Sequence, residues 1–348
     1  KNAIHYWAIG QTKSQPKRGQ AIIYCKLNVA LYGTLKAALL FWKKLTESLK
    51  LRGFTINPYD WCIANKWING KQCTIVWHVD YLKLSHKESS VIDTIITSLR
   101  AEYEKVGKMT VRRGKVHDYL GMTLDFSISG KFTVSMEKYL DDVIAKLPDD
   151  MNGTALSPAA EHLFRTRDST KKLDKEQAML FHHVTAQLLF ACKRGRPDLQ
   201  TAVSFLCTRV KEPDQDDYKK LARVIRYIRR TKFLCLTMEA SHLDQNHWYI
   251  DGAFAVHNDM KSHSGSYMTF GRGMMYGSSS KQKINTTSST EAEILAVHDN
   301  MPSILWTRYF LEEQGYPMRP SMIYQDNQSA ILLESNGCAS SSKHTRHM

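Results

Sequence analysis

The sequence predicts a multidomain protein that mixes helices and strands, of the α+β or α/β class, on three observations. The chain has 348 residues, enough for two or three domains with a sizeable core. Hydrophobic residues make up 43% and charged residues 24%, an ordinary globular composition. Segments with apolar residues at helical spacing alternate with short β-branched segments bounded by Gly, Asn or Pro.

The charge balance points to a polyanionic partner. Lys and Arg number 48 against 34 Asp and Glu, a net charge of +14. Nucleic acid is the commonest partner of so basic a chain, with an acidic membrane surface or simple solubility as the alternatives. No apolar run approaches the length of a membrane span, so we expect no membrane partner.

Cysteine use favours a reducing, intracellular compartment. The seven cysteines are odd in number and none stands in a C-x-x-C pair, which argues against a disulfide framework or a zinc ribbon. The sequence opens at Lys1 without an initiator Met or a signal peptide. We therefore expect a fragment of a longer polypeptide.

In residues 1–148, the first 28 residues are basic and Gln-rich and become strand-like at 21–27. A helix follows over 31–50, and Arg52-Gly53 ends it. The apolar residues that share one face of this helix are Leu35, Leu39, Trp42, Leu45 and Leu49.

A strand at 62–67 and the turn signal Asn69-Gly70 lead into the segment from Cys73 to His86. Residues 73–77 suit a strand, and Asp80 then stands at the turn to a second strand. A carboxylate at the tip of a hairpin is held where it can meet a metal or phosphate. A solvated Asp in a hairpin is the plainer alternative.

Four further elements complete the first 148 residues. Residues 91–103 have helical spacing, and 118–126 predict a pair of strands broken at Gly121. A strand at 131–136 follows the turn Ser129-Gly130, and the helix at 139–147 is stopped by Pro148.

Residues 149–240 begin with a linker or long loop to about 175, rich in Asp, Gly, Ser and Thr. Helices are predicted at 181–193, 198–211 and 218–230. The outer face of the third helix carries Lys219, Lys220, Arg223, Arg226, Arg229 and Arg230. A solvated face would normally mix charges of both signs, so this stripe favours contact with a phosphate backbone.

Residues 241–348 begin with a strand at 248–251 and hairpins over 264–279. A long helix follows to about 313, with Ser289 or Thr290 as its cap and Pro302 as an expected kink. A strand at 322–326 and a helix at 328–334 end the pattern.

Three acids of this last region define the sharpest predicted site. Asp251 and Asp326 end strands, and Glu293 lies near the start of the long helix. Acids gathered in this way repel one another unless cations neutralise them, and two Mg²⁺ ions suit such oxygen ligands and clamp a phosphoryl displacement. Three unrelated surface acids remain the alternative.

Several motifs in this region resemble the ribonuclease H domain of copia-type LTR retrotransposons. They are Tyr249-Ile-Asp251, Ser289-Thr-Glu-Ala-Glu293, the segment from Tyr324 to Ile331, and Ser342 to His347. The upstream part is similar to the reverse transcriptase of the same elements. The motifs there are Leu31-Tyr-Gly33 with Lys36, His78-Val-Asp-Tyr81, Asp118-Tyr-Leu-Gly121, Glu137-Lys-Tyr139, Arg196-Pro-Asp198 with 202–204, and Arg226-Tyr227 with Thr231-Lys232.

The resemblance implies three segments: a partial reverse transcriptase palm at 1–148, a linker with a helical thumb or connection at 149–240, and a ribonuclease H-like domain with a mixed sheet at 241–348. It implies metal-binding catalytic roles for Asp80 in the polymerase and for the three acids in the nuclease, with Mg²⁺ as cofactor. The implied partners are an RNA template, a DNA primer, an RNA–DNA hybrid and the rest of the polyprotein. The residues expected to contact nucleic acid are Gly33, Lys36, Lys219, Arg223, Arg226 and Arg230.

Departures from the family pattern bear on activity. The family has two aspartates where this chain has Asp80-Tyr81, and a phenol cannot replace a carboxylate at a magnesium site. The resemblance places another palm aspartate before Lys1 and a fourth nuclease acid after Met348. We therefore expect no polymerase activity and weak nuclease activity at most. A non-catalytic nucleic-acid-binding remnant and an unexpressed pseudogene product are the alternatives. The family resemblance implies a cytoplasmic virus-like particle as the location.

Overall fold

The computed structural model describes residues 33–105, 107–167 and 169–337. The chain divides into two compact units between Met109 and Thr110. The expected strand at 21–27 and the motif at 342–347 lie outside the described residues.

The described part of the first unit is a four-stranded antiparallel sheet with two helices. Leu45 and Leu49 of the first helix and Val91, Ile95 and Leu99 of the second form one core with the strands. In chain order its elements are α1 (Leu35–Leu51), β1 (Thr55–Ile56), β2 (Ile63–Ile68), β3 (Lys71–His78), β4 (Tyr81–Ser85) and α2 (Ser89–Tyr103). The sheet order is β1-β2-β3-β4, so each strand pairs with its sequence neighbour.

Only the second half of α1 follows the predicted apolar face. Leu45 and Leu49 are buried, but Leu35 is 92% and Leu39 50% exposed. The prediction of one continuous buried face is therefore wrong for the first turns, because the residues of α1 that pack in this core begin at Phe41. The predicted C-terminal end is confirmed, since Arg52 and Gly53 close the helix, but the helix starts at Leu35 and not at residue 31, because Thr34 caps it.

Both hairpins of this sheet turn on two residues. Asn69 and Gly70 have positive φ (54° and 69°), which is the type I′ geometry that the Asn-Gly pair predicts. The β3–β4 hairpin turns on Val79 and Asp80, and Val79 has φ 55°. A β-branched residue in the left-handed region is a steric outlier, so this turn holds local strain.

The second unit contains two sheets and a group of helices. Its first elements are β5 (Val116–Tyr119), β6 (Met122–Asp125), β7 (Lys131–Ser135), α3 (Glu137–Ile144), η1 (Asp149–Met151), α4 (Lys175–Cys192), η2 (Pro197–Leu199), α5 (Gln200–Arg209) and α6 (Gln215–Thr231). Those that follow are β8 (Leu236–Ala240), β9 (His247–Ala253), β10 (His263–Thr269), β11 (Gly271–Arg272), β12 (Tyr276–Lys281), α7 (Ser289–Glu313), β13 (Met322–Tyr324) and α8 (Gln328–Asn336).

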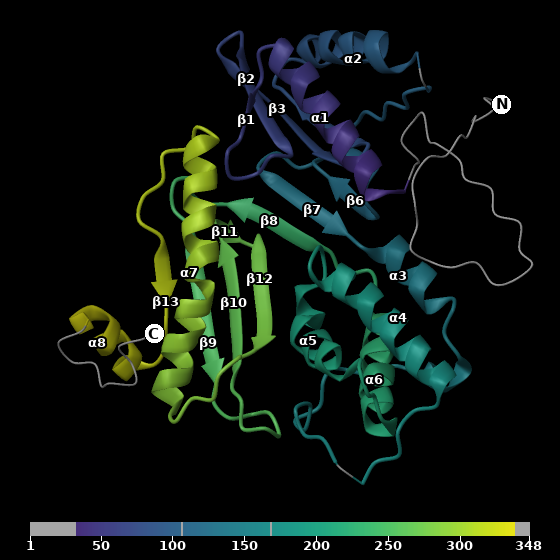
Figure 1. Cartoon of the computed structure of the whole chain (residues 1–348), viewed down its shortest axis with the longest axis vertical. Coiled ribbons are helices and arrows are strands. Elements are labelled where there is room, and N and C mark those ends of the chain that lie inside the picture. The colour runs from purple at the N-terminus through teal and green to yellow at the C-terminus, as the bar shows by residue number, and fades with distance from the viewer. Residues whose placement is uncertain (1–32, 106, 168, 338–348) are drawn as a thin grey trace, which may run out of the picture. The chain divides into compact units, whose positions relative to one another are not determined.

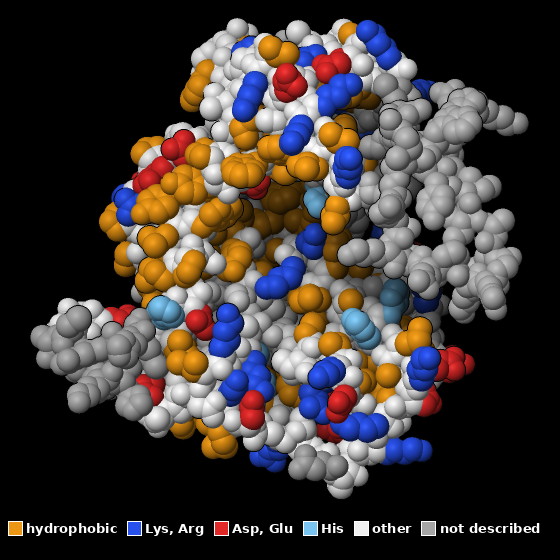
Figure 2. All heavy atoms as spheres, in the orientation of Figure 1, with side chains coloured by type: hydrophobic (Ala, Val, Ile, Leu, Met, Phe, Trp, Pro, Cys, Tyr) orange, Lys and Arg blue, Asp and Glu red, His pale blue; other side chains and the backbone are white. Residues whose placement is uncertain are grey.

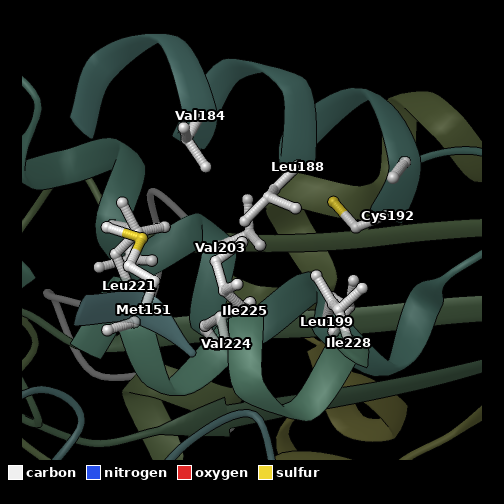
Figure 3. Packing of buried hydrophobic residues seen from close by; sticks show 14 of the residues in the cluster. Met151, Val184, Leu188, Cys192, Leu199, Val203, Leu221, Val224, Ile225 and Ile228 are labelled. Atoms are coloured by element: carbon white, nitrogen blue, oxygen red, sulfur yellow. The ribbon is translucent and has the colours of Figure 1, made fainter. Parts of the chain in front are cut away.

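The helices α3 to α6 enclose the largest buried cluster. Figure 3 shows Val184 and Leu188 of α4 facing Val203 of α5 and Ile225 of α6, all fully or almost fully buried. Helical spacing predicts Leu221, Val224, Ile225 and Ile228 on the inward face of α6, and their burial confirms this. The helix α4 starts earlier than the predicted residue 181 because Asp174 caps it by accepting from the Gln177 amide.

One five-stranded sheet, of order β11-β8-β7-β6-β5, joins residues from all three predicted segments. Val134 of β7 pairs with Leu236 of β8, and Glu239 of β8 pairs with Arg272 of β11. The predicted boundaries at 148 and 240 therefore fall within one compact unit, whereas the division after Met109 has no counterpart in the sequence prediction.

The other sheet of this unit has the order β12-β10-β9-β13, and β13 runs parallel to β9. The helix α7 lies along this sheet (Figure 1), and Trp248 and Ile250 of β9 pack against Ala296 and Ile304 of the helix. Ser288 caps α7, so the predicted caps Ser289 and Thr290 are wrong by one or two residues. The helix continues through Pro302 as a single element.

Candidate metal centre

Three acidic side chains converge at one edge of the β12-β10-β9-β13 sheet. One carboxylate oxygen from each of Asp251, Glu293 and Asp326 lies within 4.8 Å of the others. Among the described residues, this is the only group of three or more His, Cys, Asp or Glu side chains so arranged. The structure thus brings together the three acids that the sequence singled out.

Each acid comes from a different element, and the strand register aligns them. Asp251 lies near the end of β9, and Asp326 follows β13 by two residues. Tyr249 pairs with Tyr324 in the parallel ladder, so Asp251 and Asp326 each stand two residues beyond a paired position. Side chains two residues apart point to the same face of a strand, which sets both acids on one side.

Glu293 reaches the other two acids because α7 approaches β9 closely at Gly252. A Cβ added to Gly252 would lie 2.6 Å from the Ala292 carbonyl oxygen and 3.0 Å from the Glu293 amide nitrogen. Only glycine permits this contact between the backbones. Gly252 is thus a residue of the site that the sequence analysis missed, although it directly follows Asp251.

Burial raises the pKa of Glu293 above its usual value. Gln325 opposes the rise by donating a hydrogen bond, and the nearby charges of Asp251 and Asp326 raise the pKa further. Glu293 is only 6% exposed, whereas the two aspartates are exposed. A buried carboxylate beside two others is costly without a cation, so the cluster is built to receive positive charge.

The donor set suits a hard divalent cation. All three groups offer carboxylate oxygens, which Mg²⁺, Mn²⁺ and Ca²⁺ prefer, and none offers sulfur or imidazole. The cluster could therefore hold magnesium, with its open side available to a phosphate.

A groove of about 730 Å³ borders the two exposed acids of the cluster. Gln200 at the start of α5 and Asp198 of η2 form one wall. The sheet side carries three stacked tyrosines. The ring centroids of Tyr249 and Tyr267 are 4.6 Å apart, and those of Tyr249 and Tyr324 are 4.5 Å apart. The groove is open enough for an extended polar ligand to reach the carboxylates.

The groove wall is held by a buried arginine. The Arg196 guanidinium donates to both carboxylate oxygens of Asp198 and to the Thr231 hydroxyl, and it lies over the Tyr227 ring. Arg196 is fully buried, so this is a structural network. It unites two segments that the sequence analysis matched separately, Arg196-Pro-Asp198 and Arg226-Tyr227 with Thr231-Lys232.

Two buried histidines, His257 and His263, lie next to each other in the same unit. His257 Nε2 is 3.1 Å from His263 Nδ1, and His263 Nε2 is 2.7 Å from the Ser279 hydroxyl. The Phe164 ring packs against both imidazoles. Burial lowers the pKa of each histidine to about 4, so both are neutral near pH 7.

Asp80 belongs to the first unit, where it lies at the exposed tip of the β3–β4 hairpin. The predicted strand, turn and strand are confirmed. Among the described residues Asp80 belongs to no group of three metal-binding side chains, and the neighbouring Tyr81 is exposed. Its predicted role as a metal ligand stays a prediction.

Gly33 and Lys36, the other predicted contacts in the first unit, are both exposed at the start of α1. Gly33 has φ 85°, a conformation that favours glycine, and Thr34 then caps the helix. Their contact with nucleic acid stays a prediction.

Half of the six cations on the basic face of α6 are engaged within the protein, so this face is not a continuous exposed stripe. Arg226 donates to the backbone carbonyls of Asp150 and Asn152, and Arg223 donates to the Ser157 hydroxyl. Lys220 is buried and bonds the Arg165 carbonyl and Asp216. These cations bind the loop that precedes α4, which the sequence treated as a linker.

Lys219 and Arg230 remain exposed on α6 and available to a phosphate. On the face shown in Figure 2, Lys and Arg side chains are spread widely and interspersed with Asp and Glu.

These features define a mixed α/β protein with a carboxylate centre built on a sheet edge and a helix start. The described residues contain no helix that is long and apolar enough to cross a membrane. No protein-family model matches the chain.

Its relatives are retrotransposon polyproteins. The retrovirus-related Pol polyprotein from transposon TNT 1-94 of Nicotiana tabacum is 26% identical over 91% of this chain. The Pol polyprotein from transposon RE1 of Arabidopsis thaliana is 24% identical over 92% of the chain. A putative transposon Ty5-1 protein of Saccharomyces cerevisiae is 23% identical over 79% of the chain. This similarity supports a relationship to a Pol polyprotein of the Ty1/copia type.

The lengths covered differ among these relatives. The matched region is 24% of the tobacco polyprotein and 21% of the Arabidopsis one, so the chain spans between a fifth and a quarter of them. It covers 87% of the yeast Ty5-1 protein.

Proposed function

We propose that the chain comprises the reverse transcriptase and ribonuclease H region of a retrotransposon polyprotein, and that its chemistry is hydrolysis of RNA in RNA–DNA hybrids. The observation that carries the proposal is the convergence of Asp251, Glu293 and Asp326 within 4.8 Å. The Pol names of the relatives and the net charge of +14 support a nucleic-acid substrate.

Each acid has a distinct part in the proposed site. Glu293 is a buried, fixed ligand, since the contact at Gly252 sets the start of α7. Asp251 and Asp326 are exposed and line the groove, where they face an incoming phosphodiester. Bound Mg²⁺ would supply charge stabilisation for the phosphoryl displacement and activation of the attacking water.

Cleavage of a labelled RNA–DNA hybrid tests the proposal. The wild-type chain with Mg²⁺ is expected to cut the RNA strand, and Glu293→Gln, which keeps the size and removes the charge, is expected to abolish the cut. Matched DNA and RNA duplexes serve as substrate controls. Cleavage that survives Glu293→Gln, or cuts all three duplexes equally, would contradict the proposal. Binding of hybrid without cleavage would favour a non-catalytic nucleic-acid-binding protein.

We further propose that the chain does not polymerise DNA. Asp80 stands beside Tyr81 where the resembled family has a second acid, and one carboxylate holds a divalent ion weakly. Primer extension on a poly-rA template is expected to stay at the level of an Asp80→Ala control. Extension clearly above that control would overturn this part of the proposal.

A further inference from the structure

The side chain of Gln325 connects the Glu293 carboxylate to the backbone that carries Asp326. Its Nε2 donates to Glu293 Oε2 at 3.2 Å. Its Oε1 accepts from the backbone amides of Asp326 at 2.8 Å and Asn327 at 3.1 Å. One amide group thus bridges α7 to the short connection between β13 and α8 on which Asp326 stands.

The two ends of this amide have different partners, and this fixes its orientation. A carboxylate accepts hydrogen bonds, so the NH₂ end must face Glu293, and two backbone N–H groups donate, so the oxygen must face them. The reversed amide would set oxygen against carboxylate and NH₂ against N–H. Gln325 therefore has one favourable arrangement here.

The connection that carries Asp326 is also held from its other side. Asn327 caps α8 by accepting from the Ala330 amide at 3.0 Å, and Ala330 is fully buried. The backbone around Asp326 is thus fixed by Gln325 before it and by the helix cap after it. The Gln325 amide ties this fixed backbone to the Glu293 carboxylate on α7.

We propose that Gln325 is a positioning residue of the metal centre, which holds Glu293 and Asp326 at ligand spacing before the cation binds. Carboxylates gathered without a cation repel one another, and a fixed N–H donor offsets part of that repulsion. Partners that orient metal ligands typically contribute about 10–100-fold to metal affinity. The inference rests on the proposed metal centre and adds a residue to it.

Direct measurement of Mn²⁺ binding to the full chain, without nucleic acid, tests the proposal. Gln325→Met keeps the length of the side chain and removes its donor and acceptor, and it is expected to weaken Mn²⁺ binding about tenfold or more. Gln325→Asn keeps the amide on a shorter side chain that cannot span the same partners, and it is also expected to weaken binding. Gln328→Met changes an exposed glutamine three residues away and is the matched control.

Unfolding free energies and the kinetics of hybrid cleavage separate positioning from a merely structural role. A positioning role predicts variants that fold normally, need more Mg²⁺ for half-maximal cleavage, and keep the KM for hybrid. Folded Gln325 variants with wild-type Mn²⁺ affinity would overturn the inference and leave the proposed function intact. If the wild-type chain binds no Mn²⁺, or if Asp251→Asn leaves its Mn²⁺ binding unchanged, both the inference and the proposed function are overturned.

Discussion

The β3–β4 hairpin and the β9–α7–β13 edge both place an aspartate where a strand ends, but only the second makes a cluster. Asp80 is exposed on a turn between sequence neighbours, and the sheet around it pairs each strand with the next. Asp251 lies on β9 and Asp326 stands two residues past the end of β13, which pairs with β9 in parallel although α7 separates the two strands in the sequence. An acid at a strand end is therefore a candidate metal ligand only where elements far apart in the sequence bring other acidic side chains close to it.

The β3–β4 hairpin and the carboxylate cluster also differ in the kind of backbone constraint that they contain. In the hairpin, the unusual conformation is φ 55° at Val79, a strain within one turn. At the cluster, β9 and α7 approach closely at Gly252, so a larger residue there would cause strain between the backbones of two elements. Local sequence can encode the first feature, whereas the second depends on packing.

The largest expected difference between the regions is in catalysis. Asp251→Asn is expected to lower hybrid cleavage by more than the ~100-fold typical of losing a residue that only orients a ligand. Asp80→Asn is expected to leave hybrid cleavage unchanged, because Asp80 belongs to the other unit. Single-turnover cleavage rates at saturating Mg²⁺ measure both. Equal losses for the two variants would show that Asp80 and Asp251 contribute alike to hybrid cleavage.

Gly252→Ala tests whether the close approach of α7 to β9 requires a glycine. The new Cβ would lie 2.6 Å from the Ala292 carbonyl oxygen, so the start of α7 must shift, at a cost of about 1–3 kcal/mol in unfolding free energy. Gly265→Ala is the matched control, since Gly265 pairs with Asp251 and has open space around its Cβ position. Denaturant unfolding and Mn²⁺ binding are the measurements. Equal stability of the two variants would show that the close approach is not required.

The buried histidines predict that acid weakens the second unit. Because the folded pKa of His257 and His263 is about 4, against about 6.5 unfolded, the unfolded chain binds more protons below pH 6.5. Stability is then full above pH 6.5 and falls as the pH drops toward 4, by about 2 kcal/mol per histidine between pH 7 and 5. The nearby charges are Lys281, which lowers the pKa of His257, and Asp259, which raises it.

Unfolding free energies at pH 7 and pH 5 test this prediction. His257→Phe is expected to remove part of the pH dependence, since the ring still packs against Phe164 but cannot take a proton. His242→Phe, at an exposed histidine, is the control variant. An unchanged pH dependence in His257→Phe would contradict the assignment.

The smallest expected effect lies in the hairpin. Val79→Gly should relieve the positive φ and stabilise the first unit by about 1 kcal/mol. Val79→Ala, which removes the branch but keeps Cβ, should give a smaller gain. Thermal unfolding measures both variants, and a Gly variant less stable than the Ala variant would argue against strain at this turn.

Local patterns predicted most elements of the fold. The Asn69-Gly70 turn, the strand pair broken at Gly121 and the inward face of α6 all follow from spacing and turn chemistry. The errors have a common cause. The exposure of Leu35 and the engagement of Arg223 and Arg226 depend on which surfaces meet, and periodicity shows only that a face is apolar or basic.

The candidate site divides in the same way. The sequence by itself determined the acids Asp251, Glu293 and Asp326 and the strands and helix that carry them, because strand ends and helix starts are local features. Only the tertiary structure decided that they meet, since the β9–β13 register and the contact at Gly252 join residues far apart in the chain. It alone revealed Gln325 as their connection, because a hydrogen bond between α7 and the end of β13 leaves no periodic signal in the sequence.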